Sequence, residues 1–144
     1  MVFLSRSTQQ SATIKWFKEH FTAELKKAGC KSHHDTPFNI LGVGCGDGSG
    51  GDFPILDFAA HHLAHVGSKQ PLIFYRAIEP LSGFLEIFKD SAQKWRQENK
   101  TARVSFDWVL GTWEEYQVDF KQEPNSKKFH LIQNSTQLYG EQVG

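Results

Sequence analysis

The feature that most constrains the fold of this chain is a glycine-rich segment between an apolar run and an amphipathic one. The apolar run, residues 38–43, reads Phe-Asn-Ile-Leu-Gly-Val, and residues 44–51 read Gly-Cys-Gly-Asp-Gly-Ser-Gly-Gly. A short apolar run that stops at glycines is typical of a buried strand, and the pattern of residues 52–66 predicts a helix. A strand, a glycine turn and a helix in this order form the setting that a nucleotide-binding turn requires.

The other hydrophobic patterns alternate between helices and strands. Residues 7–28 and 81–99 carry apolar side chains at spacings of three and four, which predicts two helices. Residues 72–78, 102–110 and 129–133 predict three further strands. This alternation predicts an α/β fold with a parallel sheet. Because an open doubly wound sheet usually continues beyond four strands, we expect a truncated Rossmann-like domain whose fourth strand is an exposed edge.

Composition excludes several classes of protein. The 16 Lys and Arg residues balance the 16 Asp and Glu residues, so the chain lacks the broad positive field that nucleic-acid binding needs. Its apolar stretches are shorter than the roughly 20 residues of a membrane-spanning helix. The two cysteines form no CxxC pair, and the first residues do not resemble a secretion signal. We therefore expect a cytoplasmic protein that binds neither nucleic acid nor a membrane.

A carboxylate after the second predicted strand narrows the class of ligand. Glu79 lies 35 residues after Gly44, where its oxygens can accept hydrogen bonds from a ribose diol. The glycine turn alone is equally well explained as a flexible loop, but together with Glu79 it predicts a ligand that contains adenosine. A dinucleotide site usually has GxGxxG about 20 residues before its acid. This chain has GxGxG, with Ser49 at the position of the last glycine.

The glycine pattern resembles motif I of class I S-adenosylmethionine-dependent methyltransferases. A longer set of ordered segments is similar to the N-terminal half of the histamine N-methyltransferase family: residues 3–8, 40–48, 78–82, 104–108, 112–117 and 129–133. The glycine turn marks only the superfamily, whereas Phe-Leu-x-x-Ser-Thr at the start and Glu-Tyr-Gln after the third strand are more specific. The resemblance implies an N-terminal helix and loop on the substrate side, residues 1–37, and a partial cofactor-binding domain, residues 38–144.

The resemblance also implies which residues bind S-adenosyl-L-methionine. The family's glycine contact falls on Gly44, with Gly46 in the same turn, and its ribose-binding carboxylate falls on Glu79. Phe84 replaces a family glutamine, so it would stack on adenine without the amide hydrogen bonds. Trp113 stands at the position that flanks adenine, where the family usually has serine.

The substrate side departs further from the family pattern. Ile132 matches a cofactor contact at the fourth strand, and Gln133 beside it and Gln9 fall on substrate positions. The family's amine-binding carboxylate would lie at Gln9, and glutamine offers an amine only neutral hydrogen bonds. The implied activity is methyl transfer to a small amine or imidazole compound, impaired by truncation. Because the substrate nitrogen would itself attack the methyl group, no catalytic side chain of the protein is expected.

Two other interpretations of the sequence remain open. The departures at Gln9, Phe84 and Trp113 favour a non-catalytic nucleotide-binding or interaction module. A fragment of an NAD-dependent dehydrogenase fits the glycine spacing less well. A metal site is not expected, because His61 and His65 have a usable spacing but no accompanying glutamate or cysteine ligands.

Overall fold

The described part of the chain contains a five-stranded sheet in which every neighbouring pair is parallel. In this computed structural model, the described residues are 2–5, 37–66, 70–119 and 129–134, with single helical residues at 15, 19, 20 and 23. The strands are β1 (Val2–Ser5), β2 (Phe38–Val43), β3 (Leu72–Glu79), β4 (Arg103–Leu110) and β5 (Leu131–Asn134). Their order across the sheet is β1-β5-β2-β3-β4. The predicted α/β fold with a parallel sheet is confirmed.

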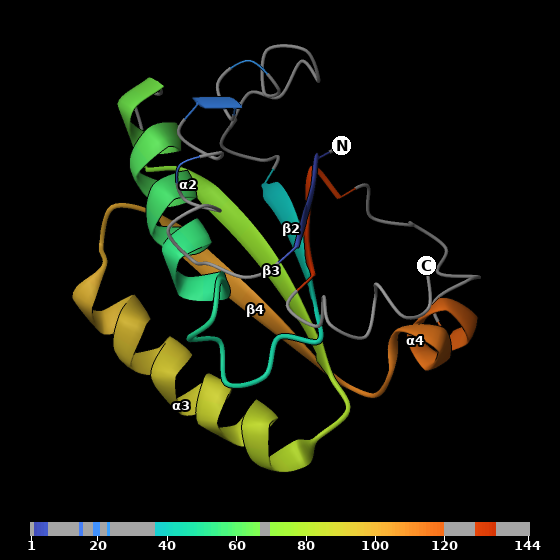
Figure 1. The fold of residues 1–144 in the computed structure, drawn as a ribbon. Coiled ribbons are helices and arrows are strands. Elements are labelled where there is room, and N and C mark those ends of the chain that lie inside the picture. The colour runs from blue at the N-terminus through green and yellow to red at the C-terminus, as the bar shows by residue number, and fades with distance from the viewer. Residues whose placement is uncertain are drawn as a thin grey trace.

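Two helices each link a pair of neighbouring parallel strands, β2 to β3 and β3 to β4, and a third helix follows β4. The helices are α2 (Asp52–Val66), α3 (Ser82–Glu98) and α4 (Trp113–Asp119). In Figure 1, α2 and α3 cover one face of the sheet, whereas α4 lies toward the other. Since β2 has β3 on one side and β5 on the other, the direction of winding reverses at β2. Ligands of open α/β sheets bind outside the carboxyl ends of the strands at such a switch point.

The helix-covered face holds the larger of two apolar clusters. Phe88 of α3 is fully buried at its centre, and its ring centroid lies 5.1 Å from that of Phe53 and 5.0 Å from that of Trp108. The rings of Tyr75 and Phe106 each lie 6.2 Å from it. These are ordinary separations for edge-to-face aromatic pairs. Alternate residues of β4 point to this face, and Val104, Phe106 and Trp108 all join the cluster.

The opposite face carries a smaller cluster. Its members are Leu41, Val43, Ile78 and Tyr116, with Val109, Trp113, Phe129 and Ile132 packed against them. Successive side chains of a strand point to opposite faces, so Ile40 joins the larger cluster and Leu41 the smaller one. Apolar residues on both faces explain why the sequence of β2 forms a continuous apolar run.

One edge of the sheet is formed by a different strand from the one that the sequence predicts. The fourth predicted strand corresponds to β5, which lies between β1 and β2. Residues Val2–Ser5 pair in parallel with β5 and shield it, so the expectation of an exposed fourth strand is wrong. The four residues of β1 were too short to give a periodic signal. The edges of the described sheet are β1 and β4.

Most other boundaries agree with the sequence prediction. The ends of β2, β3, β4, β5, α2 and α3 fall within two residues of those expected. The sequence does not predict helix α4, because its seven residues are too few to show a helical period. The predicted helix at 7–28 lies outside the described residues, apart from residues 15, 19, 20 and 23, which are helical.

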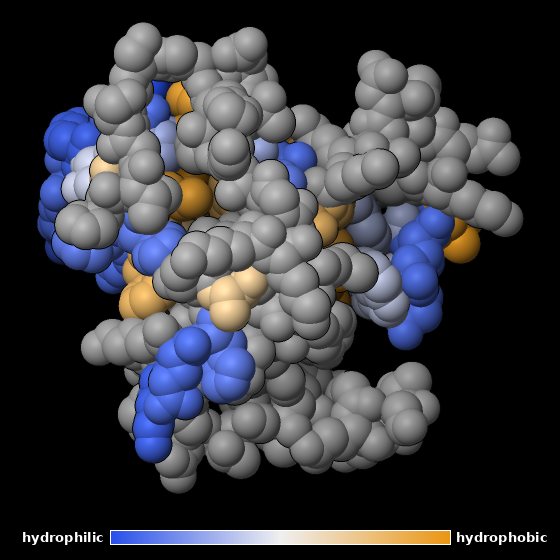
Figure 2. Space-filling view, turned by 90° about the horizontal axis from the view of Figure 1, so that it is seen from above, coloured by the Kyte–Doolittle hydropathy of each residue, from blue (hydrophilic) through white to orange (hydrophobic). Residues whose placement is uncertain are grey.

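The exposed surface of the described residues carries scattered apolar side chains. The large exposed ones are Leu81, Phe84, Ile87, Leu110 and Val118. In the view of Figure 2, the apolar areas of the described residues are small, and hydrophilic residues lie beside several of them. Among the described helices, none combines the length and the hydropathy needed to cross a membrane.

Candidate cofactor-binding site

The glycine turn that follows β2 adopts a backbone conformation that side chains disfavour. Gly44 and Gly46 have φ angles of 61° and 58°, in the left-handed region that glycine enters without steric cost. The backbone amide of Gly44 donates a hydrogen bond of 2.8 Å to the carbonyl of Ile78 in β3. This bond holds the turn against the carboxyl end of the neighbouring strand. The turn therefore lies where the sheet topology places a ligand.

Glu79 joins the glycine turn to the start of α3. Its Oε1 accepts a 2.8 Å hydrogen bond from the backbone amide of Gly46, and its Oε2 accepts one of 2.8 Å from the amide of Leu81. The residue is only 4% exposed. A carboxylate offers about four acceptor positions, so these two amides leave capacity for two hydroxyl donors such as those of a ribose diol.

Open space lies beside the turn at the point where Glu79 is bound. A Cβ atom added at Gly46 would meet no atom of the described residues within 4 Å. At Gly48, by contrast, an added Cβ would lie 2.8 Å from the ring of Phe88, so that glycine serves close packing. The turn thus has open space for a ligand beside Gly46, whereas at Gly48 it is packed against the helix-covered cluster.

A buried acid occupies the start of α2. Asp52 is fully buried, and its Oδ1 accepts a hydrogen bond from the hydroxyl of Tyr75. The backbone amide of Phe53, in the same turn, donates to the carbonyl of Gly48. A pyrophosphate needs free amides and a positive field at a helix N-terminus. Asp52 supplies negative charge there instead, which disfavours a dinucleotide and suits a cationic ligand.

Two buried groups near the turn are held in their neutral forms. Burial, together with the charges of Asp52 and Glu79, raises the pKa of the Cys45 thiol far above its ordinary value. Burial and the neighbouring Asp52 likewise raise the pKa of the Tyr75 phenol. Cys45 is therefore a packed thiol without the thiolate character of a nucleophile. The Tyr75 phenol therefore stays protonated and is the donor in its hydrogen bond to Asp52.

The residue that follows β4 is hydrogen-bonded to the backbone of Glu79. The backbone amide of Gly111 donates a 3.0 Å hydrogen bond to the carbonyl oxygen of Glu79. Thr112 then begins α4 with reciprocal bonds: its hydroxyl accepts from the amide of Glu115, and its own amide donates to Oε1 of Glu115. This capping box fixes the direction in which α4 leaves the sheet. Trp113, the first residue of α4, is thereby placed next to the strand end that carries Glu79.

The remaining predicted positions fall on different sides of the turn. Phe84 lies in the first turn of α3 and is 45% exposed. Ile132 packs in the smaller cluster with Trp113. Gln133 is fully buried on the other side of β5, where a Cβ added at Gly51 would lie 2.7 Å from its Nε2 atom. Gln9 lies outside the described residues.

Two pairs of aromatic residues lie on opposite faces of the sheet, Trp95 with Trp108 and Trp113 with Tyr116. Trp95 and Trp108 belong to the helix-covered cluster, and the indole nitrogen of Trp95 donates a 2.6 Å hydrogen bond to Asp57. Trp113 and Tyr116 lie on the opposite face, stacked with their ring centroids 5.5 Å apart. The sheet separates the two pairs, so packing accounts for the first pair and the second lies beside the candidate site.

The histidines of α2 show no metal-site geometry in the described residues. His61 is exposed, and the side chain of His65 lies outside the described part of the chain. The described residues contain no group of three or more His, Cys, Asp or Glu side chains that could hold a metal ion.

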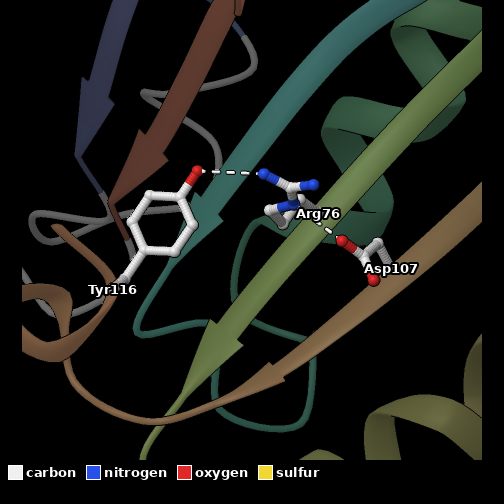
Figure 3. Close-up of polar contacts among 3 residues, drawn as sticks. All are labelled: Arg76, Asp107 and Tyr116. Atoms are coloured by element: carbon white, nitrogen blue, oxygen red, sulfur yellow. Dashed lines mark hydrogen bonds and ion pairs between the residues drawn. The ribbon is translucent and has the colours of Figure 1, made fainter. Parts of the chain in front are cut away.

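Sequence reasoning missed a buried cation on the side of the sheet that α4 occupies. Arg76 is 4% exposed; its Nε donates to Oδ2 of Asp107 at 2.7 Å, and its Nη1 donates to the Tyr116 hydroxyl at 3.2 Å (Figure 3). The rings of Phe74, Tyr116 and Phe129 have their centroids 5.4 to 5.9 Å from the guanidinium carbon. A single arginine within the otherwise apolar residues 72–78 was the signal that could have identified it.

Comparison with known proteins assigns no family to the chain. Neither the models of protein families nor the curated proteins contain a match to its sequence.

Proposed function

We propose that this chain binds S-adenosylmethionine and belongs to a methyltransferase of the histamine N-methyltransferase type, acting on a small amine or imidazole compound. The observation that carries the proposal is the contact between Gly46 and Glu79. It joins a left-handed glycine turn, with open space beside it, to a buried carboxylate that has two acceptor positions left for a ribose. The resemblance of the sequence to that family supports the same ligand.

The charges around the turn favour this cofactor over a dinucleotide. Asp52 and Glu79 are buried carboxylates, and Asp47 lies in the same turn, where its Oδ1 accepts bonds from the amide and hydroxyl of Ser49. Negative charge attracts a sulfonium and repels a pyrophosphate. The helix N-terminus that would bind a pyrophosphate already has an aspartate in its first turn.

The protein's part in such a reaction is to bind and orient. When bound, the cofactor supplies a methyl group that is already electrophilic. Glu79 would hold the ribose, the turn at Gly44 and Gly46 would admit the amino-acid half, and Trp113 would flank the base. The rate would then depend on alignment of the acceptor nitrogen with the methyl group, because a neutral nitrogen would attack the methyl group directly and no protein nucleophile is needed.

The first experiment is calorimetric titration of the purified chain with S-adenosylmethionine, S-adenosylhomocysteine and NADH. We expect the first two to bind and NADH not to bind. We expect Glu79→Gln to weaken S-adenosylhomocysteine binding roughly 10- to 150-fold, the range for a lost hydrogen bond to a charged group. Glu86→Gln, an exposed position on α3, is the matched control and should bind as the unaltered chain does. Equal affinities for Glu79→Gln and Glu86→Gln would contradict the assignment of Glu79 to the ribose.

A second candidate is a nucleotide-binding module without catalysis. The exposed Phe84, at a position where the resembling family has glutamine, is the observation that favours it. Incubating the chain with radiolabelled S-adenosylmethionine and a panel of imidazole amines separates the two functions. Methylated product would exclude the module, whereas tight cofactor binding without any product would favour it.

A further inference from the structure

We propose that Arg76 is a positioning residue that fixes Trp113 at the wall of the candidate site by holding Tyr116. This inference rests on the proposed cofactor site. It assigns a role to a buried arginine on the face of the sheet opposite α2 and α3, a residue that belongs to none of the motifs identified in the sequence.

Arg76 is held firmly on the sheet side of this arrangement. It lies in β3, and Asp107 is its register partner in β4. The 2.7 Å bond between Arg76 Nε and Asp107 Oδ2 is charge-assisted on both sides. Three aromatic rings surround the guanidinium, and a planar cation at such distances from aromatic rings is attracted by them. The direction of the remaining nitrogens is therefore set by the sheet.

Tyr116 connects the fixed guanidinium of Arg76 to α4. The Tyr116 hydroxyl accepts a 3.2 Å hydrogen bond from Nη1 of Arg76, as Figure 3 shows. Its ring is stacked on the indole of Trp113, with an interplanar angle of 25°. Because the two residues lie three positions apart in one helix, a rotation of Tyr116 would displace Trp113. The Arg76 bond thus restrains the Tyr116 end of the stack.

Trp113 is also fixed at its other end. The Gly111 amide is bonded to the carbonyl of Glu79, and the capping box of Thr112 and Glu115 sets the start of α4. The backbone at Trp113 is therefore anchored to the strand end that carries the proposed ribose acid. The Arg76–Tyr116 bond adds a directional side-chain restraint to the packing of Trp113 and Tyr116 in the smaller cluster. Without that bond, α4 keeps its start, but the angle of the indole is set by packing alone.

The experiment measures the surroundings of Trp113 and the affinity for S-adenosylhomocysteine in the same proteins. The chain is labelled with 5-fluorotryptophan, and the fluorine signals of Trp113 and Trp95 are assigned with Trp113→Phe and Trp95→Phe. Tyr116→Phe removes only the hydroxyl and keeps the ring, and Arg76→Lys keeps the charge but not the forked geometry. Lys89→Gln, which removes an exposed ion pair on α3, is the control.

We expect Tyr116→Phe and Arg76→Lys to shift or broaden the signal of Trp113 and to leave that of Trp95 unchanged. Each should weaken S-adenosylhomocysteine binding roughly two- to tenfold, corresponding to the strength of one aromatic contact. The double variant should lose little more affinity than the single variant that binds more weakly, because both changes break the same bond. Lys89→Gln should alter neither the signals nor the affinity.

Three results would overturn the proposal. One is a Trp113 signal that neither variant changes, and another is a pair of affinity losses that add fully in the double variant. The third is binding that both variants leave unchanged although the unaltered chain binds S-adenosylhomocysteine. If the unaltered chain itself does not bind, the proposed function fails together with the role of Arg76 in it, and that result is distinct from the other three.

Discussion

The two faces of the sheet are built on different physical principles. The face under α2 and α3 is an apolar cluster of interlocking rings centred on Phe88. The other described face has a smaller apolar cluster, and beside it a buried arginine is bonded to Asp107 and Tyr116. Apolar packing is non-directional and tolerates compensating shifts, whereas hydrogen bonds of a buried cation fix particular orientations. We infer that the first face sets stability and that the second face sets the geometry of α4.

Truncating Phe88 should give the largest effect and locate the main source of stability. Its ring is fully buried among four aromatic partners, and Phe88→Ala should lower the free energy of unfolding by about 3–5 kcal/mol. Urea unfolding followed by circular dichroism measures the change. Ile87→Ala, at an exposed neighbouring position, is the control and should change it by less than about 1 kcal/mol. A cost for Phe88→Ala no larger than this control would contradict the dominance of the helix-covered face.

A matched pair of tyrosine substitutions compares the polar groups of the two faces directly. The Tyr75 hydroxyl donates to the buried carboxylate of Asp52, so Tyr75→Phe should cost about 1.5–3 kcal/mol of unfolding free energy. The Tyr116 hydroxyl accepts a 3.2 Å bond from Arg76, which keeps its ion pair with Asp107, so Tyr116→Phe should cost about 0.5–1.5 kcal/mol. Urea unfolding of both variants tests the ranking. The reverse order would mean that the bond between Tyr116 and Arg76 contributes more to stability than the bond between Tyr75 and Asp52. The assignment of stability to the face under α2 and α3 would then be contradicted.

The smallest effect is a pH dependence at the amino-terminal end of the sheet. The Nδ1 atom of His130 accepts a 2.9 Å hydrogen bond from the Asn39 amide, and its ring stacks on Phe38. Burial lowers the pKa of His130 below its ordinary value of 6.5. The unfolded chain therefore takes up the proton first as the pH falls. The contribution of His130 to stability is complete above about pH 6.5 and declines below it, toward the folded-state pKa.

This dependence is measured by urea unfolding at a series of pH values from 8 to 5. We expect His130→Gln to flatten the decline below pH 6.5 relative to the unaltered chain. His61→Gln, at an exposed position of α2, is the matched control. Identical pH profiles for His130→Gln and the unaltered chain would show that the buried imidazole is not the titrating group.

The local sequence determined the elements of the central sheet and the place of the candidate site. The apolar run before the glycines predicted β2, and the periodic residues after them predicted α2. These signals are local because burial on both faces of a strand, or on one face of a helix, requires a fixed spacing of apolar residues. The same reasoning placed the glycine turn after one predicted strand and Glu79 at the end of the next, and the bond between the Gly46 amide and the Glu79 side chain agrees with that placement.

Tertiary structure alone decided which distant groups meet. The four residues of β1 are too few to carry a periodic signal, so their pairing with β5 follows from the unpaired backbone of that strand. The sequence shows Arg76 only as a charge in an apolar strand, because its partners Asp107 and Tyr116 lie 31 and 40 residues away. A buried cation is tolerated only where such partners converge, and convergence depends on the register of β3 with β4 and on the path of α4.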